Sequence, residues 1–270
     1  MDEYWIRLSP LLAIMAALIG LLFWWRWRSD RKEERAHVDA LTALAGTLGG
    51  RVVDPAESGA WSAGLLAPMR GETDGLVNRL GTVSRPRFDT ALEFRRGEWS
   101  VRVGEASVKK VAQNGTRTDY EHRIEVATSR LAPMRISRRN HGGTNSWGRP
   151  RPADDVSAQG GELVREVPVT VAAEGGRWHR VAFPPGPFDA QFAVFTGDPA
   201  AVSGLLDPET AEYLLDQAHG LPSVLHFEAG LVFGTRPGRI GPGHTLDAVD
   251  AVLGLLDRMG VAPARPPSAG

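Results

Sequence analysis

The chain has 270 residues, of which 42% are hydrophobic and 23% are charged, and it contains no cysteine. This length and apolar content are sufficient for one sizeable domain with a packed core, or for two small ones. The lack of cysteine excludes disulfide scaffolds, thiolate zinc sites and cysteine-based catalysis. A formal net charge of −1 argues against a dedicated nucleic-acid-binding protein, because such proteins usually carry an excess of basic residues.

A transmembrane helix is predicted near the start of the chain. Residues 9–25, SPLLAIMAALIGLLFWW, contain no charge, and counted from Ile6 the segment has about 20 residues, enough for a helix to cross a bilayer. Aromatic side chains flank it, as in the aromatic belts of membrane helices: Tyr4, Trp5, Trp24, Trp25 and Trp27. A cleaved signal peptide is the alternative, but it would begin with basic residues and end in small ones.

The cations that flank this segment predict an orientation. Arg7 precedes the segment, whereas five cations follow it: Arg26, Arg28, Arg31, Lys32 and Arg35. The positive-inside rule then places residues 1–8 outside the cytoplasm and the bulk of the chain on the cytoplasmic face of the plasma membrane. The lipid bilayer is therefore the first expected partner.

Residues 26–50 are predicted to form a juxtamembrane helix that continues from the membrane. They contain no proline, their apolar residues recur at spacings of three and four, and Gly49-Gly50 provides a helix stop. A short helix after a flexible neck is the alternative.

Residues 51–262 are predicted to form an α+β domain of mainly antiparallel strands with helices toward its C-terminus, followed by a disordered tail at 263–270. Alternating apolar residues over 88–95 and 99–103 indicate strands that bury Trp99. Asn114-Gly115 predicts an exposed type I′ turn, which places Val103 opposite Val126 on the returning strand.

Further strands are predicted at 134–137, 167–172 and 192–196, with a loop at 140–161 between the first two. A hairpin over 223–233 is expected to turn at Ala229-Gly230. Asp207-Pro208 is typical of a helix start, so a helix is predicted over 207–220, and a second one, centred on Leu253, over 245–259. Strands first and helices last indicate an α+β fold rather than a parallel βαβ fold.

Three segments resemble an uncharacterised actinobacterial family of single-pass membrane proteins: VNRLGTVSRPRFDTALEFRRGEWSVRV, YEHRIEVATSRLAPMRI and FPPGPFDAQFAVFTGDP. The resemblance extends over residues 39–259. It implies an N-terminal membrane segment and a domain of unknown function, and it brings over no activity and no catalytic residue.

No motif predicts a catalytic, metal or cofactor site. Residues 60–64, AWSAG, approach the nucleophile elbow of serine hydrolases but follow turn-forming residues instead of a buried strand. The seven histidines are scattered, and His122 and His226 are expected to be structural residues within strands. The glycine-rich segment 238–243 lacks the lysine of a phosphate-binding loop and is interpreted as a loop. The question of whether the protein is an enzyme stays open, with the balance against it.

One run of cations suggests a binding surface. No acid occurs between Glu125 and Asp154, and a candidate binding site is assigned to four arginines: Arg130, Arg135, Arg138 and Arg139. These cations could contact anionic lipid headgroups. The alternative is that they pair with acids on neighbouring strands, such as Glu93, Glu121 or Glu125.

Three classes of function follow. The first is a non-enzymatic interaction or scaffolding module on the cytoplasmic face, whose partner could be another membrane protein. The second is a domain that binds a lipid or another small ligand, and the third is an enzyme whose site is assembled from scattered residues. A solid core favours the first class, and a closed apolar cavity favours the second.

Overall fold

The computed structural model of the chain describes residues 2–54, 56–70, 82–112, 115–139, 169–173 and 176–267. The chain divides into two compact units, Met1–Leu44 and Ala45–Gly270. All the sheet strands belong to the second unit.

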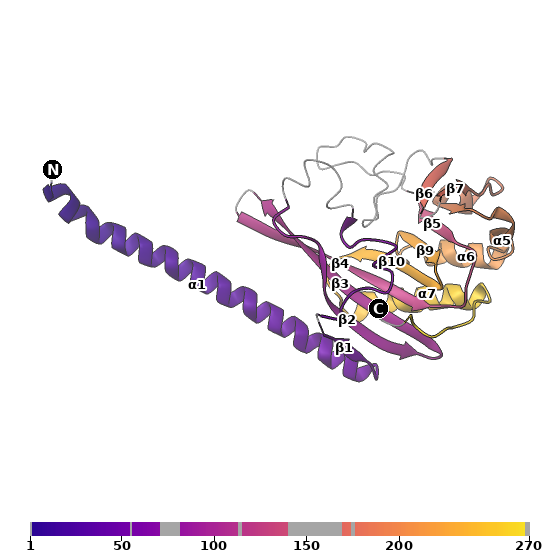
Figure 1. Cartoon of the computed structure of the whole chain (residues 1–270), viewed down its shortest axis with the longest axis horizontal. Helices are drawn as coiled ribbons and strands as arrows, with labels where there is room; N and C mark the ends of the chain where they lie inside the picture. Colours follow the sequence, from indigo (N-terminus) through magenta and orange to yellow (C-terminus); the bar gives the residue numbers. More distant parts are fainter. Residues whose placement is uncertain are drawn as a thin grey trace. The chain divides into compact units, whose positions relative to one another are not determined.

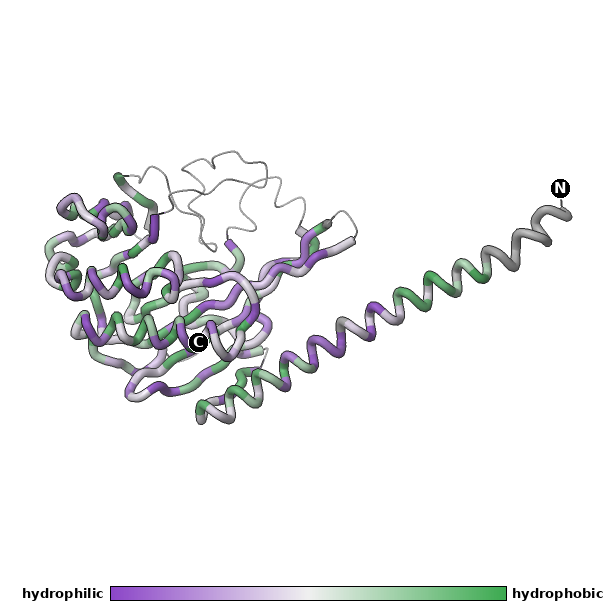
Figure 2. The backbone as a smooth tube through the Cα atoms, turned by 180° about the vertical axis from the view of Figure 1, so that it is seen from behind, coloured by the Kyte–Doolittle hydropathy of each residue, from purple (hydrophilic) through white to green (hydrophobic). Residues whose placement is uncertain are grey.

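Helix α1 (Asp2–Thr47) is continuous, with a hydrophobic stretch followed by a hydrophilic one (Figure 2). No helix in the described part of the chain is long and apolar enough to cross a membrane. The prediction of a transmembrane helix at 9–25, and with it that of a single-pass membrane protein, was therefore wrong. Arg26 and Arg28 follow the uncharged run 9–25 directly in the same helix, so the run does not extend beyond Trp25.

The helix ends at the predicted glycine pair. Gly49 has a φ of 61°, in the left-handed region that glycine adopts without strain, and the Gly50 N–H donates a 2.9 Å hydrogen bond to the Ala45 carbonyl.

A single antiparallel sheet of ten strands dominates the chain, in the order β1-β2-β3-β4-β10-β9-β5-β8-β7-β6 (Figure 1). The predicted fold class, a membrane helix leading into an α+β domain, is corrected accordingly. The strands are β1 (Arg51–Val53), β2 (Arg87–Arg96), β3 (Trp99–Ala112), β4 (Gly115–Ala127), β5 (Met134–Arg138), β6 (Thr170–Ala173), β7 (Gly176–Arg180), β8 (Phe192–Thr196), β9 (Val224–Glu228) and β10 (Leu231–Pro237). The last two strands in sequence lie in the middle of the sheet, between β4 and β5.

The hairpin of β3 and β4 is present, but its predicted register was wrong by two residues. Gly115 pairs with Ala112, and Val103 pairs with Ile124 instead of Val126. The connection is one residue earlier than predicted, which displaces the opposite strand by two residues. Because side chains alternate with a period of two, every one of them stays on its predicted face. Asn114 lies outside the described residues.

The hairpin of β9 and β10 turns at Ala229 and Gly230, as predicted. Both residues have positive φ, 54° and 76°, as a type I′ turn requires. The strand predicted at 192–196 is β8, and that predicted at 134–137 is β5, which extends one residue further. Of the strand predicted at 167–172, residues 170–172 belong to β6, whereas the predicted loop at 140–161 lies outside the described residues.

Among the described residues of the second unit, four helices follow: α4 (Pro187–Gln191), α5 (Pro199–Ser203), α6 (Pro208–Asp216) and α7 (Pro242–Arg258). The Asp207 side chain caps α6 by accepting a 2.8 Å hydrogen bond from the Thr210 N–H, as its sequence predicted. Helix α6 ends four residues before the predicted end, and α7 begins three residues before the predicted start. Tyr213 of α6 donates a hydrogen bond to the Ala251 carbonyl of α7.

The face of the sheet that α7 covers, here called the helix face, is apolar. It carries Trp99, Val101 and Ile124, and the indole N–H of Trp99 donates to Asp257 of α7 at 3.3 Å. Trp99 is 7% exposed and Leu253 is 6% exposed, so the prediction that both are buried is confirmed. The helix face is a hydrophobic core, and the candidate site lies on the opposite face.

Candidate functional site

The opposite face of the sheet, here called the loop face, carries charged residues that are buried. Part of it is covered by residues 56–70, here called the covering loop. One row of directly opposed residues, the cross-sheet row, crosses this face through nine strands, from β1 to β7: Arg51, Glu93, Arg102, Glu125, Phe233, His226, Arg135, Phe195 and Arg180. Opposed residues of antiparallel strands have Cβ atoms about 4.5–5.5 Å apart, so each member contacts the next.

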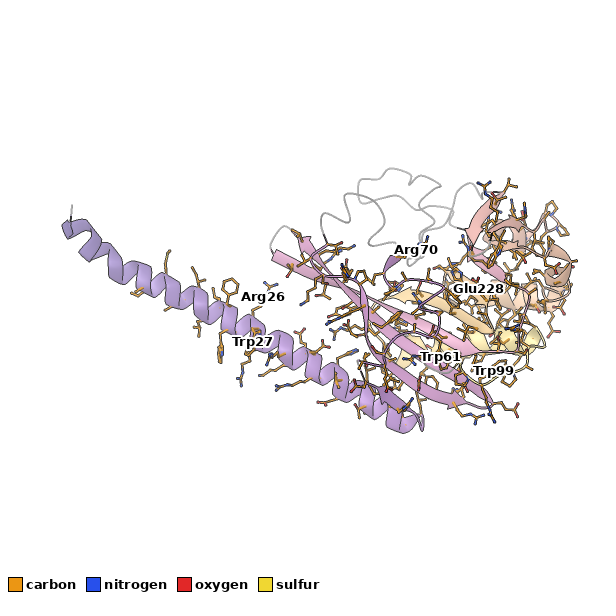
Figure 3. The ribbon with its side chains drawn as sticks, in the orientation of Figure 1. Arg26, Trp27, Trp61, Arg70, Trp99 and Glu228 are labelled. Carbon is orange, nitrogen blue, oxygen red and sulfur yellow. The ribbon has the colours of Figure 1, made fainter. Side chains whose placement is uncertain are left out.

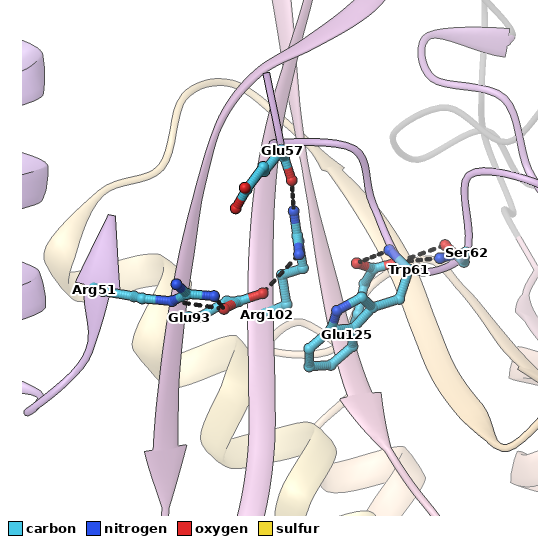
Figure 4. A network of polar contacts seen from close by, with 7 residues as sticks. All are labelled: Arg51, Glu57, Trp61, Ser62, Glu93, Arg102 and Glu125. Atoms are coloured by element: carbon cyan, nitrogen blue, oxygen red, sulfur yellow. Dashed lines mark hydrogen bonds and ion pairs between the residues drawn. The ribbon is translucent and has the colours of Figure 1, made fainter. Parts of the chain in front are cut away.

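The first four members, here called the paired segment, alternate in charge (Figure 4). Glu93 binds two guanidinium groups: that of Arg51 at 2.8 Å and that of Arg102 at 2.6 Å. Arg102 also donates to the Glu57 carbonyl of the covering loop at 2.5 Å. Each cation of this segment therefore has an acid beside it.

Glu125, the fourth member, fixes the covering loop to the sheet. Its carboxylate accepts hydrogen bonds from the Trp61 and Ser62 N–H groups, at 2.9 and 2.8 Å, and from the Ser62 hydroxyl at 2.6 Å. Ser62 is the serine of the predicted near-match to a nucleophile elbow. Its hydroxyl is buried and bound to a carboxylate, so it has a structural role here.

Arg123 and Glu121 of β4 continue this docking beside the row. Arg123 donates to the Leu66 carbonyl at 2.6 Å and to the Ala67 carbonyl at 3.2 Å, and Glu121 accepts from the Met69 N–H at 2.7 Å. Burial raises the pKa of Glu121 and lowers the pKa of Arg123. These side chains provide hydrogen-bond partners for the backbone of the covering loop where it lies against the sheet. Buried polar groups require such partners.

Further along the row, four residues form what we call the Arg135 site: Phe233, His226, Arg135 and Phe195. The His226 ring stacks on Phe233, with centroids 4.9 Å apart and an interplanar angle of 6°. The Arg135 guanidinium lies 5.4 Å from the Phe195 ring centroid, and its Nε donates to the Ser137 hydroxyl at 3.2 Å. Both polar members are half-buried.

The Arg135 site differs from the paired segment in its partners. Within the described residues, no carboxylate contacts Arg135 and no group makes a hydrogen bond with His226. A half-buried guanidinium without an acid is unusual, because burying a charge is costly unless it is paired.

The electrostatics of the site agree with this geometry. Burial, with a smaller contribution from the positive charge of Arg70, lowers the pKa of Arg135 to about 10. Burial also lowers the pKa of His226 to about 3, with smaller contributions from Arg135, Arg123 and Arg70. The imidazole is therefore neutral at pH 7, and the potential around it is positive.

Two more charged residues, Arg70 and Glu228, are labelled in Figure 3. Arg70 is exposed and ends the covering loop, and Glu228 shares the loop face with His226 because it lies two residues further along β9. Both take part in at least one further interaction of their own.

The four arginines predicted as a binding site do not come together in one exposed patch. Arg130 is exposed, whereas Arg135 is half-buried and faces the loop face. Arg138 faces the other way and donates to the Ala218 carbonyl, and Arg139 donates to the Asp189 carbonyl. Contact of these residues with lipid headgroups stays a prediction. The acids that were proposed as their partners, among them Glu93, bind other groups.

Sequence analysis interpreted His226 as a structural residue and did not single out either phenylalanine of the Arg135 site. The hairpin signal at 229–230 places His226 opposite Phe233, but nothing in the sequence shows that β5 lies beside β9.

The described residues contain no group of three or more side chains suited to hold a metal ion. His122 and His244 come close, with ring centroids 5.6 Å apart, and His122 Nδ1 lies 3.0 Å from the Gly238 carbonyl. Burial lowers the pKa of His122 to about 4. The glycine-rich segment 238–243 leads into α7.

No family model matches this sequence, and no curated protein is similar to it. Among solved structures, the crystal structure of the mycobacterial trehalose monomycolate transport factor A, TtfA, aligns with a TM-score of 0.41 and 11% identity, over 85% of this chain and 97% of that chain. A similarity this low assigns neither a fold nor an activity to the present chain. The resemblance to an actinobacterial family stays a prediction.

Proposed function

We propose that the second unit is a non-enzymatic binding module for a small organic anion, with the acidic group of the ligand at Arg135 and His226. The observation that carries this proposal is the half-buried Arg135 guanidinium, which has no carboxylate partner in the described part of the chain. Hydrogen bonds between a guanidinium and an acidic group are among the strong ones, and their planar geometry adds specificity.

The surroundings of Arg135 suit such a ligand. Its Nε is held by Ser137 and its guanidinium lies against Phe195, so the side chain is oriented before any ligand binds. A neutral imidazole beside it can donate one hydrogen bond to the same acidic group.

Apolar side chains lie next to the charged ones and could contact the organic part of the ligand. Trp61 and Leu65 of the covering loop are half-buried and pack against the cluster that contains Phe233. Val171 packs in the same way against the cluster of Phe195. A small ligand with one acidic end and one apolar end therefore fits the residues of this face.

The test is calorimetric titration of the full chain with benzoate, phenyl phosphate and the uncharged benzyl alcohol. We expect at least one anion to bind and the alcohol not to bind, and we expect R135M to weaken anion binding about tenfold or more, which corresponds to about 1.4 kcal/mol. R130Q is the matched control, because Arg130 is an exposed arginine outside this site. Absence of anion binding, or equal binding by R135M, would refute the proposal.

A further inference from the structure

We infer that His122 and His244 together bind a transition-metal ion of the class that imidazole prefers, such as Zn²⁺, between the sheet and the start of α7. This pair lies on the helix face, on the other side of the sheet from the Arg135 site, so the inference goes beyond the proposed function. It is supported by the separation of the two rings, by the hydrogen bonds of their nitrogens and by one buried nitrogen without a partner.

The two rings come from different elements and meet at one point. His122 lies on β4 two residues before Ile124, so it shares the helix face, and it is 0% exposed. His244 is exposed in the first turn of α7. Their ring centroids are 5.6 Å apart, with an interplanar angle of 66°. Two imidazoles that bind one ion at about 2.0–2.1 Å have centroids about 5–6 Å apart, so this separation suits a shared ion.

The backbone of the glycine-rich segment fixes which nitrogen of each ring carries a proton. His122 Nδ1 lies 3.0 Å from the Gly238 carbonyl, and His244 Nε2 lies 3.3 Å from the Arg239 carbonyl. A carbonyl only accepts hydrogen bonds, so each of these nitrogens donates. Metal-binding histidines donate their second nitrogen in the same way, often to a backbone carbonyl. In the neutral rings, the lone pairs are then on His122 Nε2 and His244 Nδ1.

The Nε2 atom of His122 is buried and has no hydrogen-bond partner in the described part of the chain. Buried polar atoms normally have one, and an ion is among the explanations for an exception. Burial lowers the pKa of His122 to about 4, so at pH 7 the ring is neutral and its lone pair can bind a metal. A histidine with a purely structural role would be expected to have both nitrogens bonded.

Two charged residues lie opposite His122 on the neighbouring strands. Glu105 of β3 is 2% exposed, and its carboxylate accepts from the Ile240 N–H at 2.8 Å. Arg236 of β10 donates to the Gly220 carbonyl. The Glu105 carboxylate therefore offsets part of the charge of an ion at His122 while it holds the glycine-rich segment. With two protein ligands, water completes the coordination, as at the open position of catalytic zinc sites.

Gly241 allows the His244 ring to occupy its position. A Cβ atom at residue 241 would lie 2.4 Å from Cε1 of His244. The backbone of Gly241 is extended, with a φ of −138°, so alanine fits the backbone and only the histidine ring has to move. G241A thus displaces one ligand without replacing either histidine.

The experiment is calorimetric titration of the full chain with Zn²⁺ at pH 7. We expect one ion to bind with a Kd of about 1–100 μM. H244A should weaken this binding about tenfold or more, and G241A about threefold or more. Because His244 is exposed, H244A is expected to keep the fold. H219A is the matched control, since it removes an exposed histidine elsewhere, and it should change the Kd by less than about twofold.

A second measurement uses thermal unfolding. Zn²⁺ should raise the Tm of the wild type and of H219A but not that of H244A, because an ion that binds the folded chain stabilises it. Absence of Zn²⁺ binding by the wild type, or an H244A variant that keeps its affinity, would refute the site. Equal losses in H219A and H244A would also refute it, because scattered surface histidines would then account for the binding. None of these results bears on anion binding at Arg135, which lies on the opposite face.

Discussion

The paired segment and the Arg135 site, two parts of the cross-sheet row, each contain an arginine on the loop face, but the two arginines have different partners. In the paired segment, Arg102 is 3% exposed and bonded to Glu93 and to a carbonyl of the covering loop. A few strands away, Arg135 lies on the same face and in the same row, with a hydrogen bond to Ser137 and the Phe195 ring against its guanidinium, and with no carboxylate in contact among the described residues. Arg102 is buried and Arg135 is half-buried, so the main difference lies in their partners.

This comparison separates a structural charge from the charge that we propose to bind a ligand. A buried ion pair contributes little net stability over apolar residues, but removing one member leaves an uncompensated charge. The fold therefore depends on both members of such a pair, and the charged groups that hold the covering loop are an example. A cation without a partner costs stability in the empty protein, and a ligand that neutralises it recovers that cost.

The largest effect is expected from E125Q in the paired segment. This change removes the charge that faces Arg102 and Arg123 and weakens three hydrogen bonds to the covering loop. We expect the free energy of unfolding to fall by about 2–4 kcal/mol, because three hydrogen bonds lose their charged acceptor and a bond to a charged group contributes about 1.5–3 kcal/mol. Urea denaturation followed by circular dichroism measures it. A loss below about 1 kcal/mol would mean that the loop docks without this carboxylate.

A smaller effect is expected from pH at the Arg135 site. The pKa of His226 in the folded chain is about 3, below its ordinary value of about 6.5, so the unfolded chain takes up a proton that the folded chain excludes. This contribution to stability is complete above pH 6.5 and is lost as the pH falls toward 3, by at most about 1.4 kcal/mol per pH unit.

The variant H226F keeps a ring stacked on Phe233 and removes the titration. We expect its unfolding free energy to fall less steeply than that of the wild type between pH 6 and pH 4. His122, whose pKa is lowered to about 4, titrates in both proteins and cancels in the comparison. Parallel curves for the two proteins would show that His226 is as accessible to protons as a free histidine.

R135M is expected to change the free energy of unfolding by less than about 1 kcal/mol, in either direction. The change leaves no described carboxylate without its counter-charge, and the methionine side chain keeps the contact with Phe195. Urea denaturation in the absence of ligand gives this value. A loss as large as that of E125Q would place Arg135 among the structural charges.

R51Q is expected to have the smallest effect in the row. The Arg51 side chain is 68% exposed, and solvent screens its ion pair with Glu93. We expect an unfolding midpoint that cannot be distinguished from that of the wild type. A clear shift in the unfolding midpoint would mean that Arg51, on the edge strand β1, also contributes to stability.

Local signals predicted much of this fold. Alternation revealed β2, β3 and the helix-face residues of β4, Asp207-Pro208 marked the start of α6, and Ala229-Gly230 marked a hairpin. The strands that were missed, β1 and β7, are short and have no clear alternation. The membrane span was predicted from the uncharged run 9–25, but charged residues follow that run directly within the same helix.

The candidate site could not be predicted because it depends on the order of strands in the sheet. Arg135 was chosen for its neighbours in sequence, Arg130, Arg138 and Arg139, but alternation sends Arg138 to the other face. Its neighbours in space come from β8 and β9, which follow much later in the chain. Pairing between distant strands leaves no local signature in a single sequence.

The position of β10 also has a consequence for how the chain folds during synthesis. Strand β4 is complete at Ala127, but its partner β10 begins only at Leu231, and β5 likewise waits for β9. A ribosome that adds about 5–20 residues per second leaves both strand edges without their final partners while the intervening residues emerge. A nascent chain that stalls before this last hairpin would present two open edges to chaperones or to other nascent chains, so the sheet closes only near the end of translation.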